Sequence, residues 1–181
     1  MRTSGRCKVE EQSSPFPELY QSNYSAPFNN AKSLITMSSK ASPYSGNVIN
    51  YSPAKSYDFS RSYAIVVSGA TWNPCGHLLL NVGGYGGWYF HIAETKGYPR
   101  LMDQLGYQRY IHENNKNELS RTFVPLKYPQ RSMVKLVELL SRKWSWWLLP
   151  NNCASFVEEV LQAGGTTAGL YSNCPAREVF R

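Results

Sequence analysis

The stretch Asn151-Asn152-Cys153-Ala154-Ser155-Phe156-Val157 places a cysteine directly after two asparagines, at the beginning of an amphipathic pattern. Apolar residues continue at helical spacing through Val160 and Leu161, and the pattern ends at Gly164-Gly165. Asparagine is a favourable helix N-cap and glycine a favourable helix stop. The stretch therefore predicts a helix that carries Cys153 in its first turn.

A cysteine in that position has a chemical consequence. The unpaired amides and the positive end of the helix dipole favour the thiolate over the thiol, and the thiolate is the nucleophilic form. We therefore interpret Cys153 as a nucleophile. The alternative is a small buried helix residue, because a free cysteine packs like an apolar side chain.

The composition indicates one folded domain preceded by a different segment. The 181 residues are 42% hydrophobic, which is enough for one core. Residues 1–58 are rich in Ser, Pro, Asn and Tyr and poor in Leu, Ile and Val, so they do not bury enough apolar surface to fold alone. We expect an extended, poorly structured arm over 1–58, with tyrosines that lie against the folded body, and a folded domain over 59–181.

The net charge of +7 either attracts the chain to anionic polymers, such as cell wall or lipid headgroups, or serves solubility. The Lys and Arg residues are scattered, so we expect no nucleic-acid binding. No apolar run approaches the ~18–20 residues that span a bilayer. The first residues also lack the apolar stretch of a secretory signal. We therefore expect no transmembrane segment and no Sec signal peptide.

Beyond residue 58 the sequence alternates between short apolar runs and turns. Residues 63–67 predict a buried strand, and the apolar runs 76–82 and 88–93 flank a loop with four glycines, which is typical of a hairpin. Further patterns predict a helix or structured insertion over 99–112, an edge strand over 121–126 and a helix over 133–140 capped by Ser132. Together they predict an α+β fold, in which a small antiparallel sheet packs against the helix of Cys153.

Two of the three histidines lie on the predicted hairpin. If its loop is symmetric about Tyr85, His77 and His91 are diagonal neighbours on one face, about 5–8 Å apart at Cβ. His77 then serves as the base for Cys153, and His91 as the group that orients this base. The alternatives are a buried histidine bonded to the backbone at 77 and a polar member of an aromatic-rich strand at 91. His112 lies in a polar loop pattern and is expected at the surface.

The four cysteines leave other arrangements open. Cys75 lies two residues from His77 and is a rival thiol, although its surroundings predict a turn and not a helix start. A disulfide between Cys153 and Cys174 would contradict the nucleophile. A zinc site from Cys75, His77, His91 and Cys153 has suitable ligand types, but C-x-H is not a usual zinc spacing. We expect no metal and no cofactor.

The order of these motifs resembles the circularly permuted branch of the NlpC-type papain-like cysteine peptidases and amidases, which includes the lecithin:retinol acyltransferase-like proteins. The segment Gly76-His77-Leu78-Leu79-Leu80 is similar to the family's histidine strand, and His91 to its third polar position. The segment Asn152-Cys153-Ala154-Ser155-Phe156 is similar to its nucleophile motif. The resemblance covers residues 62–165. The separation of 14 residues between the two histidines departs from the family's pattern.

The resemblance implies a permuted papain-like domain that performs acyl transfer. The Cys153 thiolate would attack an amide or ester carbonyl, His77 would protonate the leaving group, and His91 would be the third catalytic residue. The backbone N–H of Cys153 and a second donor would hold the oxyanion, with Gln, Asn and main-chain groups as candidates for that donor.

Many bacterial members of this family cleave peptide bonds in peptidoglycan, and small members without a signal peptide resemble interbacterial effectors delivered by type VI secretion. The resemblance thus implies a stem-peptide endopeptidase or amidase. It would be made in the cytoplasm, secreted, and act as an antibacterial toxin in the periplasm of a target cell. Its partners would be peptidoglycan, a cognate immunity protein and secretion machinery. The alternatives are a lipid-directed acyltransferase or phospholipase of the same fold, and a non-catalytic wall-binding module.

Overall fold

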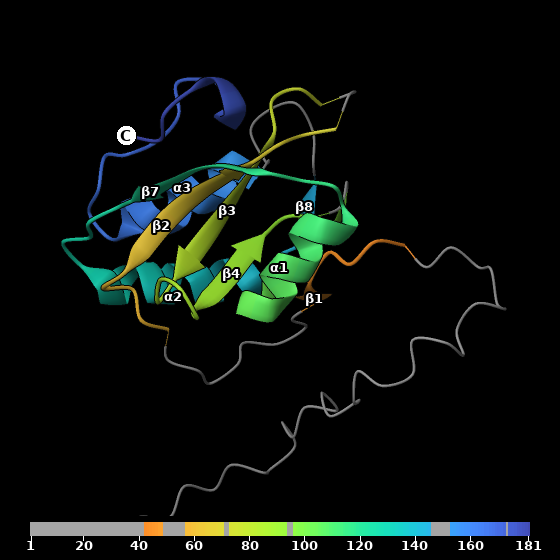
Figure 1. The fold of residues 1–181 in the computed structure, drawn as a ribbon. Helices are drawn as coiled ribbons and strands as arrows, with labels where there is room; N and C mark the ends of the chain where they lie inside the picture. Colours follow the sequence, from red (N-terminus) through yellow and green to blue (C-terminus); the bar gives the residue numbers. More distant parts are fainter. Residues whose placement is uncertain (1–41, 49–56, 71–72, 94–95, 146–152, 173) are drawn as a thin grey trace, which may run out of the picture. The chain divides into compact units, whose positions relative to one another are not determined.

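An antiparallel six-stranded sheet with helices on both faces forms the domain (Figure 1). The computed structural model describes residues 42–48, 57–70, 73–93, 96–145, 153–172 and 174–181, which belong to one unit from Ser42 to Arg181. This confirms the predicted α+β class. No helix in these ranges combines the length and the apolar character that crossing a bilayer requires.

The strands of the sheet follow the order β1-β6-β4-β3-β2-β7, and every neighbouring pair is antiparallel. They are β1 (Asn47–Val48), β2 (Ser62–Val67), β3 (His77–Val82), β4 (Trp88–His91), β6 (Arg100–Met102) and β7 (Glu118–Phe123). The short strands β5 (Lys96–Gly97) and β8 (Trp144–Ser145) pair separately. The helices are α1 (Gln104–Glu113), α2 (Pro129–Leu140) and α3 (Cys153–Ala163), with a 3-10 turn, η1, at Pro175–Arg177.

The central strands β2, β3 and β4 are buried on both faces of the sheet. Along β2, Ala64 and Val66 belong to one hydrophobic cluster, whereas Ile65 and Val67 belong to a second cluster. Successive side chains of a strand point to opposite faces, so one cluster lies on each face. A strand that is buried on both sides is almost continuously apolar, which explains the uninterrupted apolar run over residues 63–67 of β2.

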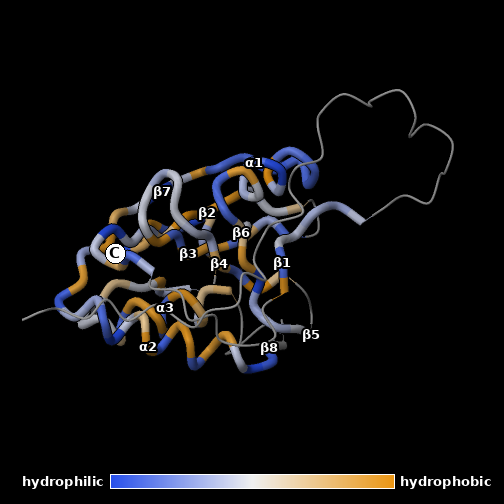
Figure 2. Tube along the Cα trace, turned by 90° about the horizontal axis from the view of Figure 1, so that it is seen from below, coloured by the Kyte–Doolittle hydropathy of each residue, from blue (hydrophilic) through white to orange (hydrophobic). Residues whose placement is uncertain are grey.

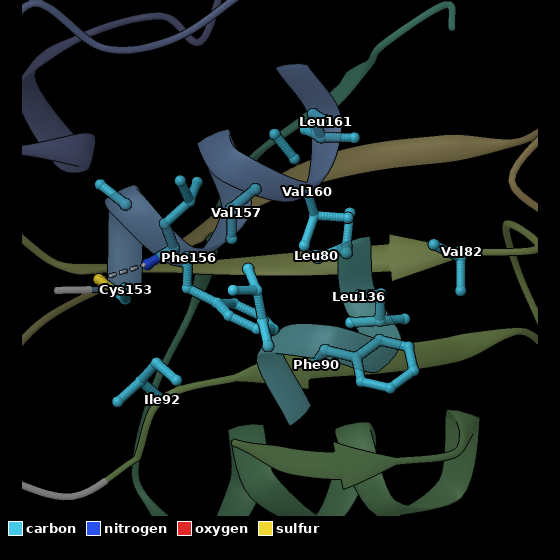
Figure 3. Close-up of a cluster of buried hydrophobic side chains, with 14 of the residues drawn as sticks. Leu80, Val82, Phe90, Ile92, Leu136, Cys153, Phe156, Val157, Val160 and Leu161 are labelled. Atoms are coloured by element: carbon cyan, nitrogen blue, oxygen red, sulfur yellow. Dashed lines mark hydrogen bonds between the residues drawn. The ribbon is translucent and has the colours of Figure 1, made fainter. Parts of the chain in front are cut away.

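Helices α2 and α3 cover one face of the sheet, and α1 lies on the other (Figure 2). From α3, Phe156, Val157 and Val160 are fully buried in the same cluster as Leu80 and Phe90 of the sheet (Figure 3). Each such side chain contributes about 1.5–3 kcal/mol of burial free energy. This packing holds the beginning of α3 in place over β3.

Helix α1 follows directly after β6, so the region predicted as a helix or an insertion contains a short strand and a helix. The side chain of Asp103 caps α1 by accepting a hydrogen bond from the backbone N–H of Gly106 at 2.7 Å. The ring of Tyr107 stacks on that of Tyr89 in β4, with the centroids 4.2 Å apart. Aromatic stacking thus contributes to the attachment of α1 to the sheet.

The hairpin of β3 and β4 has the predicted register. Its cross-strand pairs are symmetric about Tyr85, namely Leu80↔Phe90, Asn81↔Tyr89 and Val82↔Trp88. The side-chain amide of Asn81 donates to the carbonyls of Gly84 and Trp88, at 3.1 and 3.2 Å, and so bridges the glycine loop. The prediction that His77 and His91 share a face follows from this register and is confirmed.

Part of the predicted arm is attached to the sheet. Strand β1 pairs with β6, and the carbonyl of Tyr44 accepts a hydrogen bond from the side chain of Asn114 at 2.8 Å. Tyr57 is buried. These two tyrosines therefore lie against the folded domain, as the composition predicted, whereas residues 1–41 and 49–56 of the arm lie outside the described part of the chain.

The beginning of α2 was predicted wrongly. The helix starts at Pro129, so Ser132 lies inside it and is buried and does not act as a cap. Proline suits the first helical position because its fixed φ matches the helix and its missing N–H is not needed there. At the edge of the sheet, β7 is the edge strand that the sequence predicted, but it ends at Phe123, before Pro125.

A disulfide between Cys75 and Cys174 joins the C-terminal segment to the beginning of β3. The two residues are 99 positions apart in the sequence, and their Cα atoms are 4.3 Å apart. The backbone N–H of Ala176 also donates to the carbonyl of Cys75 at 2.9 Å. The alternatives of a Cys153–Cys174 disulfide and of Cys75 as a rival free thiol are both wrong, because each requires a thiol that this bond consumes.

Removing this disulfide should lower the free energy of unfolding by about 2–5 kcal/mol, because the bond restricts the unfolded chain. The change can be measured by urea unfolding of Cys75→Ser, Cys174→Ser and the double variant. Since one bond is lost in every case, the three variants should lose similar amounts. A wild-type unfolding midpoint that does not change when reductant is added would contradict the prediction.

Candidate active site

Cys153 is the first residue of α3, and its thiol is free and buried. The helix ends where the sequence predicted. The N–H of Gly164 donates to the carbonyl of Leu161, and Gly165 has a φ of +86°, a conformation that favours glycine. The predicted N-cap, Asn152, lies outside the described residues.

The sulfur of Cys153 contacts the beginning of β3 (Figure 3). The backbone N–H of Leu78 donates to Sγ at a distance of 3.5 Å. Pairing of β3 with β4 begins only at Leu80↔Phe90, so Leu78 pairs with Val66 of β2 but not with β4. The sulfur is thereby placed against the residue that follows His77 in the chain.

Gly76 allows the chain to enter β3 directly before His77. Its φ is +72°, and a Cβ at this position would lie 2.6 Å from the carbonyl oxygen of Val67. Any other side chain would therefore displace the β2–β3 pairing at Val67↔His77. This steric restriction explains why a glycine directly precedes His77 in the sequence.

His77 and His91 form a hydrogen-bonded pair. Nε2 of His77 lies 2.9 Å from Nδ1 of His91, and Nε2 of His91 lies 2.9 Å from the carbonyl oxygen of Ser45. Both histidines are buried. Two segments that are far apart in the sequence, the hairpin and residues 42–48, thus meet at this pair.

The carbonyl of Ser45 decides the tautomers of both rings. A carbonyl only accepts hydrogen bonds, so Nε2 of His91 carries the proton and its Nδ1 is an acceptor. Nε2–H of His77 consequently donates to Nδ1 of His91. The lone pair of neutral His77 is therefore at Nδ1. In this arrangement, Nδ1 of His77 is the proton acceptor and His91 orients the ring.

Both imidazoles are held in the neutral form. Burial lowers the pKa of His77 well below its usual value, and the positive charge of protonated His91 and that of Lys116 lower it further. Burial also lowers the pKa of His91 to about 4, against the raising effect of the hydrogen bond to Ser45; Arg100 and Lys116 add to the lowering. At neutral pH, His77 is therefore a base and not an acid.

The thiol of Cys153 is also neutral, in contrast to the thiolate that the sequence predicted. Burial raises its pKa to about 11, although the N–H groups of Leu78, Ala154 and Cys153 itself lower it. The helix start does supply stabilising amides, as expected, but removal of the sulfur from water has the larger effect. The free site thus contains a thiol beside a neutral base.

The structure joins the two histidines of the predicted triad by a hydrogen bond and places the cysteine close to their strand. His77 and His91 are directly bonded, and Sγ of Cys153 contacts the backbone next to His77. Within the described part of the chain, no hydrogen bond joins Sγ to either imidazole. The roles of Cys153, His77 and His91 in catalysis stay predictions.

Cys75, Cys174 and His112, which the sequence analysis also considered, do not take part in this site. The zinc alternative requires Cys75, which is in a disulfide, and the described residues contain no group of three potential ligands that could hold a metal ion. His112 is exposed near the end of α1, as expected. Cys7 lies outside the described residues.

Three residues near the histidine pair were missed by the sequence analysis. They are Ser45, which accepts from His91; Tyr110, whose ring centroid lies 5.0 Å from that of His91; and Lys116, which acts electrostatically on both histidines. Each comes from an element outside the hairpin and α3. Only Ser45 was indicated indirectly by the sequence, because it lies in residues 1–58, whose tyrosines were predicted to lie against the folded domain.

Comparisons with family models, with curated proteins and with solved structures give no match to this chain.

The neutral histidine pair should make the protein less stable in mild acid. In the unfolded chain an imidazole takes up a proton as pH falls below about 6.5, whereas His91 in the fold resists protonation until about pH 4. The unfolded state therefore binds more protons in this window. The contribution of His91 is complete above pH 6.5 and should fall by roughly 3 kcal/mol as pH approaches 4.

This can be measured by urea unfolding at several pH values with wild type and His91→Asn, which keeps a neutral hydrogen-bonding side chain. The variant should show a flatter dependence between pH 6.5 and 4. His112→Asn, which changes an exposed histidine, is the matched control and should behave like the wild type. Parallel curves for wild type and His91→Asn would show that the pair is not held neutral.

Proposed function

We propose that this chain is a cysteine hydrolase of the permuted papain-like type that cleaves amide bonds in the stem peptides of peptidoglycan. The observation that carries the proposal is the position of the only free thiol in the described part of the chain. It lies at the start of a helix, on the backbone next to a buried histidine pair with a defined tautomer.

The proposed reaction begins with the neutral site. As the sulfur attacks the carbonyl carbon, the proton of the Cys153 thiol passes to Nδ1 of His77, so the thiolate forms only during attack. The resulting imidazolium keeps its hydrogen bond to Nδ1 of His91, which stays neutral and accepts. In this mechanism Sγ and Nδ1 approach each other in the substrate complex, as catalytic hydrogen bonds often do.

The second half of the reaction returns the site to its starting state. His77 gives the proton to the leaving amine, the C–N bond breaks and an acyl-enzyme remains on Cys153. Water, deprotonated by His77, then hydrolyses the thioester and regenerates the thiol. This cycle needs a base that is neutral at the start of each half, which agrees with the lowered pKa of His77.

Two further observations support a target outside the cytoplasm. The Cys75–Cys174 disulfide is typical of proteins that work in an oxidising compartment such as the periplasm. The net charge of +7 favours approach to an anionic polymer such as the cell wall. We therefore propose an antibacterial toxin that acts in the periplasm of a target cell, with a secretion machine and a cognate immunity protein as partners.

Purified protein should release soluble peptide-containing fragments from peptidoglycan sacculi, detected by mass spectrometry. Cys153→Ala removes the nucleophile and should abolish release. His77→Ala removes the base and should slow release by about 10²–10⁴-fold. The exposed His112→Ala is the matched control and should retain full activity.

The same preparation should be incubated with phospholipid vesicles. Phospholipid turnover without wall digestion would contradict the wall substrate and favour the lipid-directed alternative of the same fold. Wall binding that is unchanged in Cys153→Ala, with no product from either substrate, would favour the non-catalytic module.

A second prediction concerns the compartment. Expression with an added periplasmic signal should lyse or arrest a bacterial host, whereas the same chain without that signal should be tolerated, because peptidoglycan and the oxidising environment are both periplasmic. Growth curves of cells that express wild type or Cys153→Ala in each compartment provide the measurement. Equal toxicity of the two proteins in the periplasm would count against catalysis as its cause.

A further inference from the structure

Tyr110 is a buried tyrosine at the histidine pair that the proposed mechanism does not use. It lies in α1 and is 4% exposed. Its ring contacts His91, with the centroids 5.0 Å apart and the planes tilted by 58°. It therefore approaches the pair from the helix layer opposite to that of Cys153.

The hydroxyl of Tyr110 forms no hydrogen bond with another residue in the described part of the chain. The neighbouring tyrosine on the same side of α1 differs in this respect, because the hydroxyl of Tyr107 donates to Glu118 at 2.6 Å. Buried tyrosine hydroxyls usually find a partner. With no partner among the described residues, this hydroxyl is available to donate a hydrogen bond to a ligand at Cys153.

The same hydroxyl interacts electrostatically with the sulfur of Cys153. Burial raises the pKa of Tyr110 above its usual value, and negative charge on Cys153 raises it further. The hydroxyl therefore stays protonated at neutral pH and is a hydrogen-bond donor. Negative charge that develops at Cys153 during attack therefore acts on this hydroxyl.

We propose that the Tyr110 hydroxyl donates a hydrogen bond to the oxyanion of the tetrahedral intermediate on Cys153. This rests on the proposed function and supplies the second oxyanion donor, beside the backbone N–H of Cys153. When the C–S bond forms, the carbonyl π electrons move to oxygen and the thiol proton is on His77. Tyr110 holds the oxyanion without giving up its proton. When the C=O bond re-forms, the bond to the leaving group breaks and the proton of His77 passes to that group.

The test compares two reagents that both modify Cys153. Acetylation by p-nitrophenyl acetate passes through a tetrahedral oxyanion, whereas alkylation by iodoacetamide is a direct displacement that does not. Release of p-nitrophenolate gives the first rate, and the mass of the Cys153 peptide gives the second. Cys153→Ala provides the background for both.

Tyr110→Phe keeps the ring on His91 and removes no hydrogen bond that joins two described residues, so it should fold normally. We expect its acetylation rate to fall by roughly 10²–10³-fold, as for loss of one oxyanion donor, while its alkylation rate stays at the wild-type value. Tyr107→Phe is the matched control and should acetylate like the wild type, even if it is less stable.

Three results would overturn the proposal, and they are distinguishable. Equal acetylation of Tyr110→Phe and wild type would show that only the ring is needed. A parallel fall in both rates would show that Tyr110 acts on the thiol or on His77 and not on the oxyanion. Wild-type protein whose Cys153 is alkylated but never acetylated would remove the proposed hydrolase function itself.

Discussion

The hydrogen bond between His77 and His91 constrains the structure around it. It requires β3 and β4 in a single register, because a slip of one residue would send one imidazole to the opposite face. It also requires the carbonyl of Ser45, which accepts from His91 and thereby orients both rings. Helix α1 contacts the pair through the ring of Tyr110, which packs against His91. The hairpin, residues 42–48 and α1 thus all contribute contacts to this pair.

Burial gives this pair its chemical character. Removal from water holds both imidazoles neutral, and the nearby cations Lys116 and Arg100 act in the same direction. The thiol of Cys153 is neutral for the same reason. Because its groups are neutral, the site avoids the large free-energy cost of burying isolated ions in a medium of low dielectric constant. Its reactivity then depends on groups that stabilise charge when a substrate is attacked, which is the role that the histidine pair and Tyr110 are proposed to share.

The candidate site draws side chains from both faces of the sheet. Cys153 comes from the layer of α2 and α3, whereas Tyr110 comes from α1 on the other face, with the histidine pair on the strands between them. The disulfide between Cys75 and Cys174 secures the chain just before His77. Each side chain is thus held by an element that is itself buried or cross-linked, which limits its movement relative to the others.

The sequence by itself determined α3 with Cys153 at its start and the β3–β4 hairpin with His77 and His91 on one face. Caps, glycine turns and side-chain periodicity act over a few residues, so a single chain displays them. Only the tertiary structure decided that Cys75 pairs with Cys174, that the thiol is neutral, and that Ser45 and Tyr110 complete the surroundings of the pair. These depend on burial and on contacts between segments up to 99 residues apart, and no local pattern encodes them.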